Sequence, residues 1–140
     1  TTDYGPRSRA HYERAAAMDK SPAAVAGRFT KLAIEEGKPD EAAKQYFSAE
    51  LVEHGLLPGA AGRAARLQER GWGSPAQQRK ILNTVANKDL AVVQQLVFSA
   101  EGQPPHSEVD IFRVQDGLIV EHWEVIQAHS AADTDEERAG

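Results

Sequence analysis

The chain has no cysteine and no long apolar run. Without cysteine, its 140 residues form neither a disulfide nor a thiolate metal site. No apolar segment approaches the ~18 residues needed to cross a bilayer. Residues 1–20 also lack the apolar block of a signal sequence. We therefore expect a cytoplasmic protein with no membrane partner.

The chain has no excess of basic residues. It carries 21 acidic and 16 basic residues, for a formal net charge of -5. A protein that grips a phosphate backbone needs a basic patch, so we expect no nucleic-acid partner. The five histidines show no metal-ligand spacing, and no glycine-rich phosphate loop follows a strand. We therefore expect no metal and no cofactor.

The length predicts one domain, because a chain of this size buries roughly two-thirds of its extended surface on folding. We expect that domain at residues 21–129. Residues 1–20 are predicted to form an N-terminal arm or extra helix, and the acidic residues 130–140 a disordered tail.

Helical signals come first in the chain. Ser21 and Pro22 provide an N-cap followed by proline at the first helical position. After a break at residues 37–39, acidic residues open a second helix, which we predict to extend to His54.

From Gln78 onward the apolar pattern is that of strands, at 81–86, at 90–99 and in a final hairpin. Helices followed by strands predict an α+β fold. We expect a curved antiparallel β-sheet that forms a cone against the N-terminal helices, with a mouth suited to a hydrophobic small molecule.

The hairpin is the most specific pattern in the sequence. Two strands flank the turn dipeptide Asp116-Gly117. Counting outward from a two-residue turn gives four pairs: Gln115 with Leu118, Val114 with Ile119, Phe112 with Glu121, and Asp110 with Trp123. These pairs share faces. Asp110 therefore shares an apolar face with Phe112, Glu121 and Trp123, and His122 lies on the opposite face.

A carboxylate on an apolar sheet face is either paired or held there for chemistry. Asp110 is therefore a candidate general base that removes a proton next to a carbonyl group. The structural alternative is that Asp110 bonds a neighbouring side chain and fixes the sheet.

Two segments resemble the SnoaL-like polyketide cyclases of the nuclear-transport-factor-2-like, or ketosteroid-isomerase-like, superfamily. Residues 109–114 and 116–123 (VDIFRV and DGLIVEHW) resemble the family's Asp-Ile-Phe-Arg and Ile-Val-Glu-His-Trp run, although Glu124 stands where the family has Asp. Residues 46–54 with Pro58-Gly59 resemble a second family block. The resemblance implies an α+β barrel and an intramolecular aldol condensation without a cofactor.

Further residues are candidates for the site. His54 is a supporting donor to the substrate or to Asp110; the alternative is a histidine that interacts with a helix C-terminus. Glu121 is a second carboxylate or a rim residue, and Trp123 is a pocket wall. Tyr46 and Phe112 are candidate substrate contacts, and either Gln94 or Gln95 faces the substrate.

These features predict an acid-base enzyme on a hydrophobic carbonyl substrate, a polyketide-type cyclase or related isomerase, with Asp110 and His54 as its catalytic residues. One alternative is a non-catalytic small-molecule-binding or dimerisation module, and another is an epoxide hydrolase or dehydratase. For His122 we expect packing in a homodimer formed through its face of the sheet.

Overall fold

A computed structural model describes residues 19–54, 67, 70–99 and 104–128 of the chain. Its helices are α2 (Pro22–Thr30), the π-helix η1 (Lys31–Glu35) and α3 (Pro39–Tyr46). Its strands are β1 (Phe47–His54), β2 (Gln78–Asn87), β3 (Leu90–Phe98), β4 (His106–Gln115) and β5 (Leu118–Ala128). The order of elements is that of an α+β fold, as the sequence predicted.

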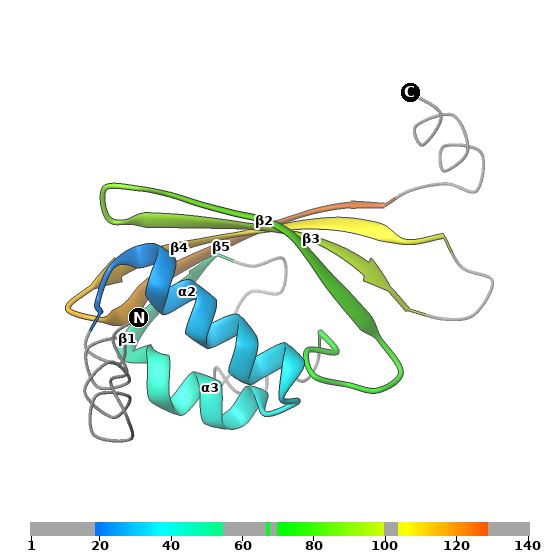
Figure 1. Ribbon diagram of the computed structural model, residues 1–140, viewed down its shortest axis with the longest axis horizontal. Helices are drawn as coiled ribbons and strands as arrows, with labels where there is room; N and C mark the ends of the chain where they lie inside the picture. Colours follow the sequence, from blue (N-terminus) through cyan, green and yellow to red (C-terminus); the bar gives the residue numbers. More distant parts are fainter. Residues whose placement is uncertain (1–18, 55–66, 68–69, 100–103, 129–140) are drawn as a thin grey trace, which may run out of the picture.

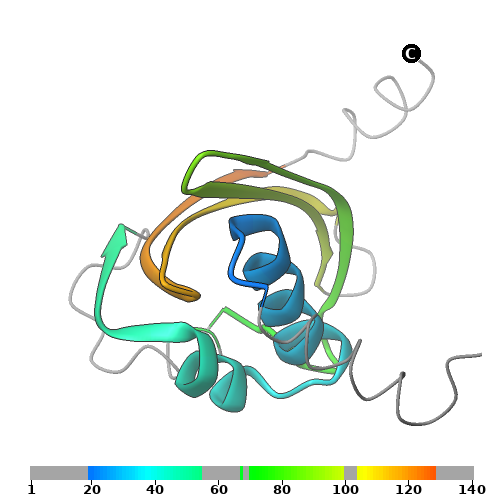
Figure 2. The same cartoon turned by 60° about the vertical axis from the view of Figure 1, so that its left-hand side comes forward.

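The five strands form one curved sheet in the order β1-β5-β4-β3-β2. Strands β2 to β5 are the predicted antiparallel meander. Strand β1, which the sequence did not predict, pairs with β5 in parallel, so the sheet as a whole is mixed. The sheet curls around α2, which lies in its concave face (Figures 1 and 2).

The second helix is shorter than predicted. It ends at Tyr46, and Phe47 has the extended dihedrals φ -85 and ψ 136. Residues that we expected to continue the helix to His54 form β1 instead, and they pair with the outer edge of β5. Filling an open sheet edge satisfies backbone groups there, and such tertiary pairing overrides a local helical preference.

The apolar core is centred on Phe29 of α2. Its ring stacks on Phe47 at a centroid distance of 4.9 Å and meets Phe112 at 5.5 Å and Trp72 at 5.7 Å. Helix α2 begins as predicted, with the hydroxyl of Ser21 accepting from the backbone of Ala24. This helix therefore fixes the inner face of the sheet, on which the candidate site lies.

The segments predicted as arm and tail, 1–20 and 130–140, lie outside the described residues apart from Asp19 and Lys20. Within the part of the chain that the structure describes, no helix has the length and apolar character needed to span a membrane.

Gly73 holds the loop before β2 against η1, and replacing it is expected to destabilise the protein. Its φ is +74, and a Cβ atom there would lie 2.7 Å from the carbonyl oxygen of Ala33. We predict that Gly73→Ala lowers the free energy of unfolding by about 2 kcal/mol or more. Urea denaturation monitored by tryptophan fluorescence measures this.

Gly27→Ala is the matched control, because an added Cβ atom at this position in α2 meets nothing within 4 Å. It should raise the stability by roughly 0.5–1 kcal/mol, since alanine favours a helix interior. Equal effects of the two variants would contradict the close packing of Gly73.

Candidate functional site

The hairpin turn forms as predicted, but the register of its strands shifts by one residue beyond the two pairs nearest to the turn. Asp116 and Gly117 both have positive φ, as a type I′ turn requires. Gln115 pairs with Leu118, and Val114 with Ile119. The register then skips Val120, so β5 contains a bulge.

The bulge reverses the faces predicted for the rest of β5. Phe112 pairs with His122 and Asp110 pairs with Glu124, instead of the predicted Glu121 and Trp123. His122 therefore lies on the inner face beside Asp110 and not on the outer face, where we expected it to pack in a dimer. The extra residue is the physical reason, because a one-residue shift exchanges the two faces of a strand.

Five polar side chains meet on the inner face at the end of the sheet away from the hairpin turn. They come from β3, β4 and β5, and all are buried: Gln95, Glu108, Asp110, His122 and Glu124. We call this group the inner cluster. Burying so many polar groups is costly unless they are paired or have a function.

Asp110 is fully buried and accepts from two neighbours. Nε2 of His122 lies 2.8 Å from its Oδ1, and Nε2 of Gln95 donates to its Oδ2 at 2.7 Å. The other ring nitrogen of His122, Nδ1, lies 2.8 Å from a carboxylate oxygen of Glu53 on β1. Ionised carboxylates only accept, so an imidazole between two of them must donate from both nitrogens.

Two arginines face the other carboxylates. Nη1 of Arg79 donates to Oε2 of Glu108 at 3.0 Å, and both side chains are almost completely buried. Nε of Arg70 lies 2.8 Å from Oε1 of Glu124, but it is not aligned for a hydrogen bond. Oε1 of Glu108 and both Glu124 oxygens have no hydrogen-bond partner among the described residues.

These surroundings change the protonation of the cluster. Burial, together with the charge of Asp110, raises the pKa of Glu108 to about 9. The same two causes raise the pKa of Glu124. Burial alone would lower the pKa of His122, but its bonds to Asp110 and Glu53 outweigh burial and raise that pKa to about 10. At neutral pH the cluster thus holds a protonated carboxyl group and an imidazolium.

The three carboxyl groups also have a geometry that suits a metal ion. One oxygen each from Glu108, Asp110 and Glu124 lies within 4.8 Å of the others. However, Arg70, Arg79 and His122 already oppose these charges. The cationic surroundings favour a retained proton over a divalent ion.

Three predicted site residues lie together on the outer face. His54 stacks on Trp123 at 5.0 Å, and its Nε2 lies 2.7 Å from Glu121. Glu121 also accepts from Arg113, which bonds Asp89 as well. Arg113 lies on this outer face too, and faces away from Asp110 on the same strand. The bulge turns Glu121 and Trp123 outward, away from Asp110, and His54 pairs with Trp123 from β1 on the same face.

The remaining predicted residues are divided between the faces. Phe112 is fully buried and stacks on His122 at 4.9 Å. Gln95 faces inward, whereas Gln94 is exposed and accepts from Asn83. Tyr46 packs its ring edge against Phe29, and its hydroxyl accepts from Gln45. Gln94 and Tyr46 therefore do not belong to the inner cluster.

Six residues of this site were not predicted as functional candidates: Glu53, Arg70, Arg79, Glu108, His122 and Glu124. Glu108 had an available signal, since it precedes Asp110 by two residues and must share its face. No sequence signal identifies Arg79, because its contact with Glu108 depends on the pairing between β2 and β3.

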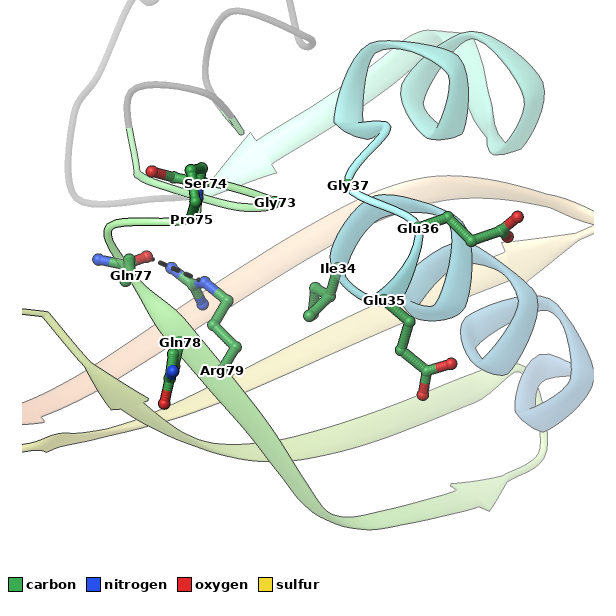
Figure 3. A pocket seen from close by; sticks show the side chains of 10 residues that line it. All are labelled: Ile34, Glu35, Glu36, Gly37, Gly73, Ser74, Pro75, Gln77, Gln78 and Arg79. Carbon is green, nitrogen blue, oxygen red and sulfur yellow. Dashed lines mark hydrogen bonds between the residues drawn. The ribbon is translucent and has the colours of Figure 1, made fainter.

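A groove of about 530 Å³ lies beside the cluster. The end of η1 and Gly37 form one side, and residues 73–79 form the other (Figure 3). Arg79 lines this groove and also donates to Glu108. A molecule bound in the groove would therefore contact the cation that pairs with Glu108.

Comparisons with known proteins agree with the fold. No protein-family profile and no curated protein matches the sequence. An NTF2-like protein of unknown function from Mesorhizobium loti superimposes with a TM-score of 0.63 at 24% identity, over 76% of this chain and 91% of that chain. A candidate polyketide cyclase from Bacillus cereus gives 0.55 at 18%, over 74% and 72%. A candidate SnoaL-like polyketide cyclase from Jannaschia gives 0.51 at 14%, over 67% and 79%. At these identities the similarity establishes the fold alone: the chain has the NTF2-like fold that the resemblance predicted.

Proposed function

We propose that the chain is a cofactor-independent acid-base enzyme that acts on a hydrophobic carbonyl compound, as a polyketide-type cyclase or related isomerase. The observation that carries this proposal is the inner cluster. It places an ionisable base, Asp110, beside a carboxyl group, Glu108, that stays protonated at neutral pH. A buried pair of this kind combines a proton acceptor with a proton donor.

The two groups would divide the chemistry of an aldol cyclisation. Asp110 takes a proton from the carbon next to a carbonyl group, and the Oε1–H of Glu108 donates to the enolate oxygen that forms. The enolate carbon then attacks a second carbonyl carbon of the same molecule, and the resulting alkoxide takes the proton that Asp110 removed, which restores the carboxylate of Asp110. Stabilising the enolate in a water-poor site accounts for much of the acceleration in such reactions.

Buried carboxyl oxygens without an aligned hydrogen bond support a catalytic role over a purely structural one. A structural network satisfies its buried polar atoms. Here Oε1 of Glu108 and both oxygens of Glu124 have no hydrogen-bond partner among the described residues. The NTF2-like fold of the candidate cyclases above is consistent with this proposal.

Epoxide opening or dehydration is the second candidate function. It needs a second acid and a place for water near Asp110. An inward-facing Glu121 within reach of Asp110 would support this function, but Glu121 lies on the outer face. Glu124 takes its place, because it pairs with Asp110 across the strands and has two acceptor oxygens without a hydrogen-bond partner among the described residues.

Deuterium exchange tests the proposal before the substrate is identified. The protein is incubated in D₂O with a panel of hydrophobic diketones and polyketones, and exchange next to the carbonyl groups is followed by NMR. We predict that Asp110→Asn slows exchange by at least about 10²-fold, because it removes the base. Mass spectrometry of the same samples detects cyclised products.

Asp116→Asn is the matched control, since it makes the same change in the exposed turn and should leave exchange unaltered. Exchange by Asp110→Asn at the wild-type rate would exclude Asp110 as the base. Saturable binding without exchange by the wild-type protein would instead favour the binding module.

A further inference from the structure

Glu53 holds a position next to the inner cluster that the proposed chemistry has not yet used. It lies on β1 directly beside His122 of β5. Its two carboxylate oxygens are 2.8 and 2.9 Å from Nδ1 of His122. Its side chain is 17% exposed, while that of Asp110, on the other side of the imidazole, is fully buried.

Two contacts determine the orientation of the His122 imidazole: one sets the plane of the ring, and the other sets the positions of its two nitrogens. The ring of Phe112 stacks on it with an interplanar angle of 12°, which sets the plane of the imidazole. Stacking still allows the ring to flip over about its Cβ–Cγ bond, because the flipped ring lies in the same plane. Glu53 removes this freedom, because its carboxylate sets which nitrogen faces β1 and which faces Asp110.

We propose that Glu53 is a positioning residue for the candidate base: by accepting from Nδ1 of His122, it aims the Nε2–H of that residue at Oδ1 of Asp110. With Oδ1 engaged by His122, the carboxylate of Asp110 is held in one orientation. Its other oxygen, Oδ2, accepts from Gln95. The catalytic importance of Glu53 rests on the proposed function, but its orientation of His122 does not depend on that function.

The arrangement makes the charge of His122 depend on Glu53. Among the described residues, the ionisable groups that face this imidazole are Asp110 on β4, Glu53 on β1 and, by its charge, Glu124 on β5. Removing the negative charge of Glu53 leaves one hydrogen-bonded carboxylate instead of two. The imidazolium should then lose a proton at lower pH.

Glu53→Gln tests this proposal, because glutamine keeps the size and an acceptor oxygen but not the charge. The titration of His122 is followed by ¹⁵N NMR from about pH 6 to about pH 11. We expect its pKa to fall by at least about one unit in Glu53→Gln. Glu50→Gln is the matched control, since it removes the same charge from an exposed position on β1 and should leave the titration unchanged.

A turnover readout separates positioning from simple structure. The test uses a ketone in which the wild-type protein catalyses deuterium exchange next to the carbonyl group. The alkaline limb of the plot of kcat against pH should move to lower pH in Glu53→Gln, with KM unchanged. An unchanged His122 titration would overturn the proposal, and so would a shifted titration with an unchanged kcat profile. If the titration shifts but the wild-type protein exchanges no ketone, the link from Glu53 to His122 stands and the proposed function fails.

A measurement on the wild-type protein covers the case in which Glu53→Gln does not fold. At about pH 8, His122 should show ¹⁵N shifts of a doubly protonated ring and a slowly exchanging Nδ1 proton. A neutral ring with protonated Nε2 and a bare Nδ1 would overturn the proposal.

Discussion

Replacing Arg79 with methionine is expected to lower the free energy of unfolding by about 3–5 kcal/mol, because it leaves three buried acceptors without their hydrogen-bond donor. The guanidinium donates to Glu108, to Gln95 and to the backbone carbonyl of Arg70. It also lies over the ring of Trp72 at 4.8 Å. Methionine fills a similar volume but offers none of these donors.

Urea denaturation of Arg79→Met measures the loss, with Lys80→Met as the matched control. Lys80 is the next residue of β2 and is exposed, so its replacement should change stability by less than about 0.5 kcal/mol. The loss of stability in Arg79→Lys should lie between those of Arg79→Met and Lys80→Met, since lysine keeps the charge but lacks the planar guanidinium group. A loss below about 1 kcal/mol in Arg79→Met would show that Glu108 does not depend on this cation.

The sequence predicts the faces of β4 correctly and those of β5 wrongly, for one reason. The Asp116-Gly117 turn fixes the pairs nearest to it, and alternation along β4 then places Asp110 and Phe112 inward. On β5, alternation fails after Ile119 because a bulged residue has no pattern of its own in the sequence.

The partners of Asp110 were beyond prediction from local pattern. His122 reaches it because of that bulge, and Glu53 reaches His122 because β1 joins the sheet in parallel. The two contacts join residues on separate strands, 12 and 69 positions apart in the sequence. Alternation along a strand specifies which face a side chain occupies only where no bulge intervenes, and register between strands decides what it touches.

The molecule divides its inner face into two regions of different character. Near the hairpin, Val114, Ile119 and Phe112 pack with Phe29 into an apolar core. Farther along the same strands, polar side chains at equivalent inward positions form the inner cluster. The first region supplies stability through apolar burial. It allows the second to hold charged groups that by themselves would not favour folding.

The inner cluster should give the protein an unusual dependence of stability on pH, in which it loses stability as the solution becomes alkaline. The folded state raises the pKa of Glu108 from 4.5 to about 9 and that of His122 from 6.5 to about 10. A group with a raised pKa binds its proton more tightly when folded, so its contribution is complete below the unfolded pKa. That contribution is lost as the pH rises toward the folded pKa.

Between pH 6.5 and pH 9, Glu108 and His122 therefore both lower the stability of the folded state as the pH rises. The expected loss is roughly 1 kcal/mol per pH unit for each group, and less where the two titrations are coupled. The lowered pKa values of Asp89 and Glu121 act in the opposite direction, but below this range, because the unperturbed values are 3.8 and 4.5.

Urea denaturation across this pH range measures the slope, and Glu108→Gln separates the two groups. Glutamine imitates the protonated carboxyl group, so this variant should keep most of the stability at neutral pH and show a shallower alkaline slope. A wild-type stability that is constant or rises between pH 6.5 and pH 9 would mean that Glu108 is ionised and His122 neutral in the folded state. The same result would remove the proton donor from the proposed mechanism, so the pH dependence of folding tests the chemistry of the site before any substrate is identified.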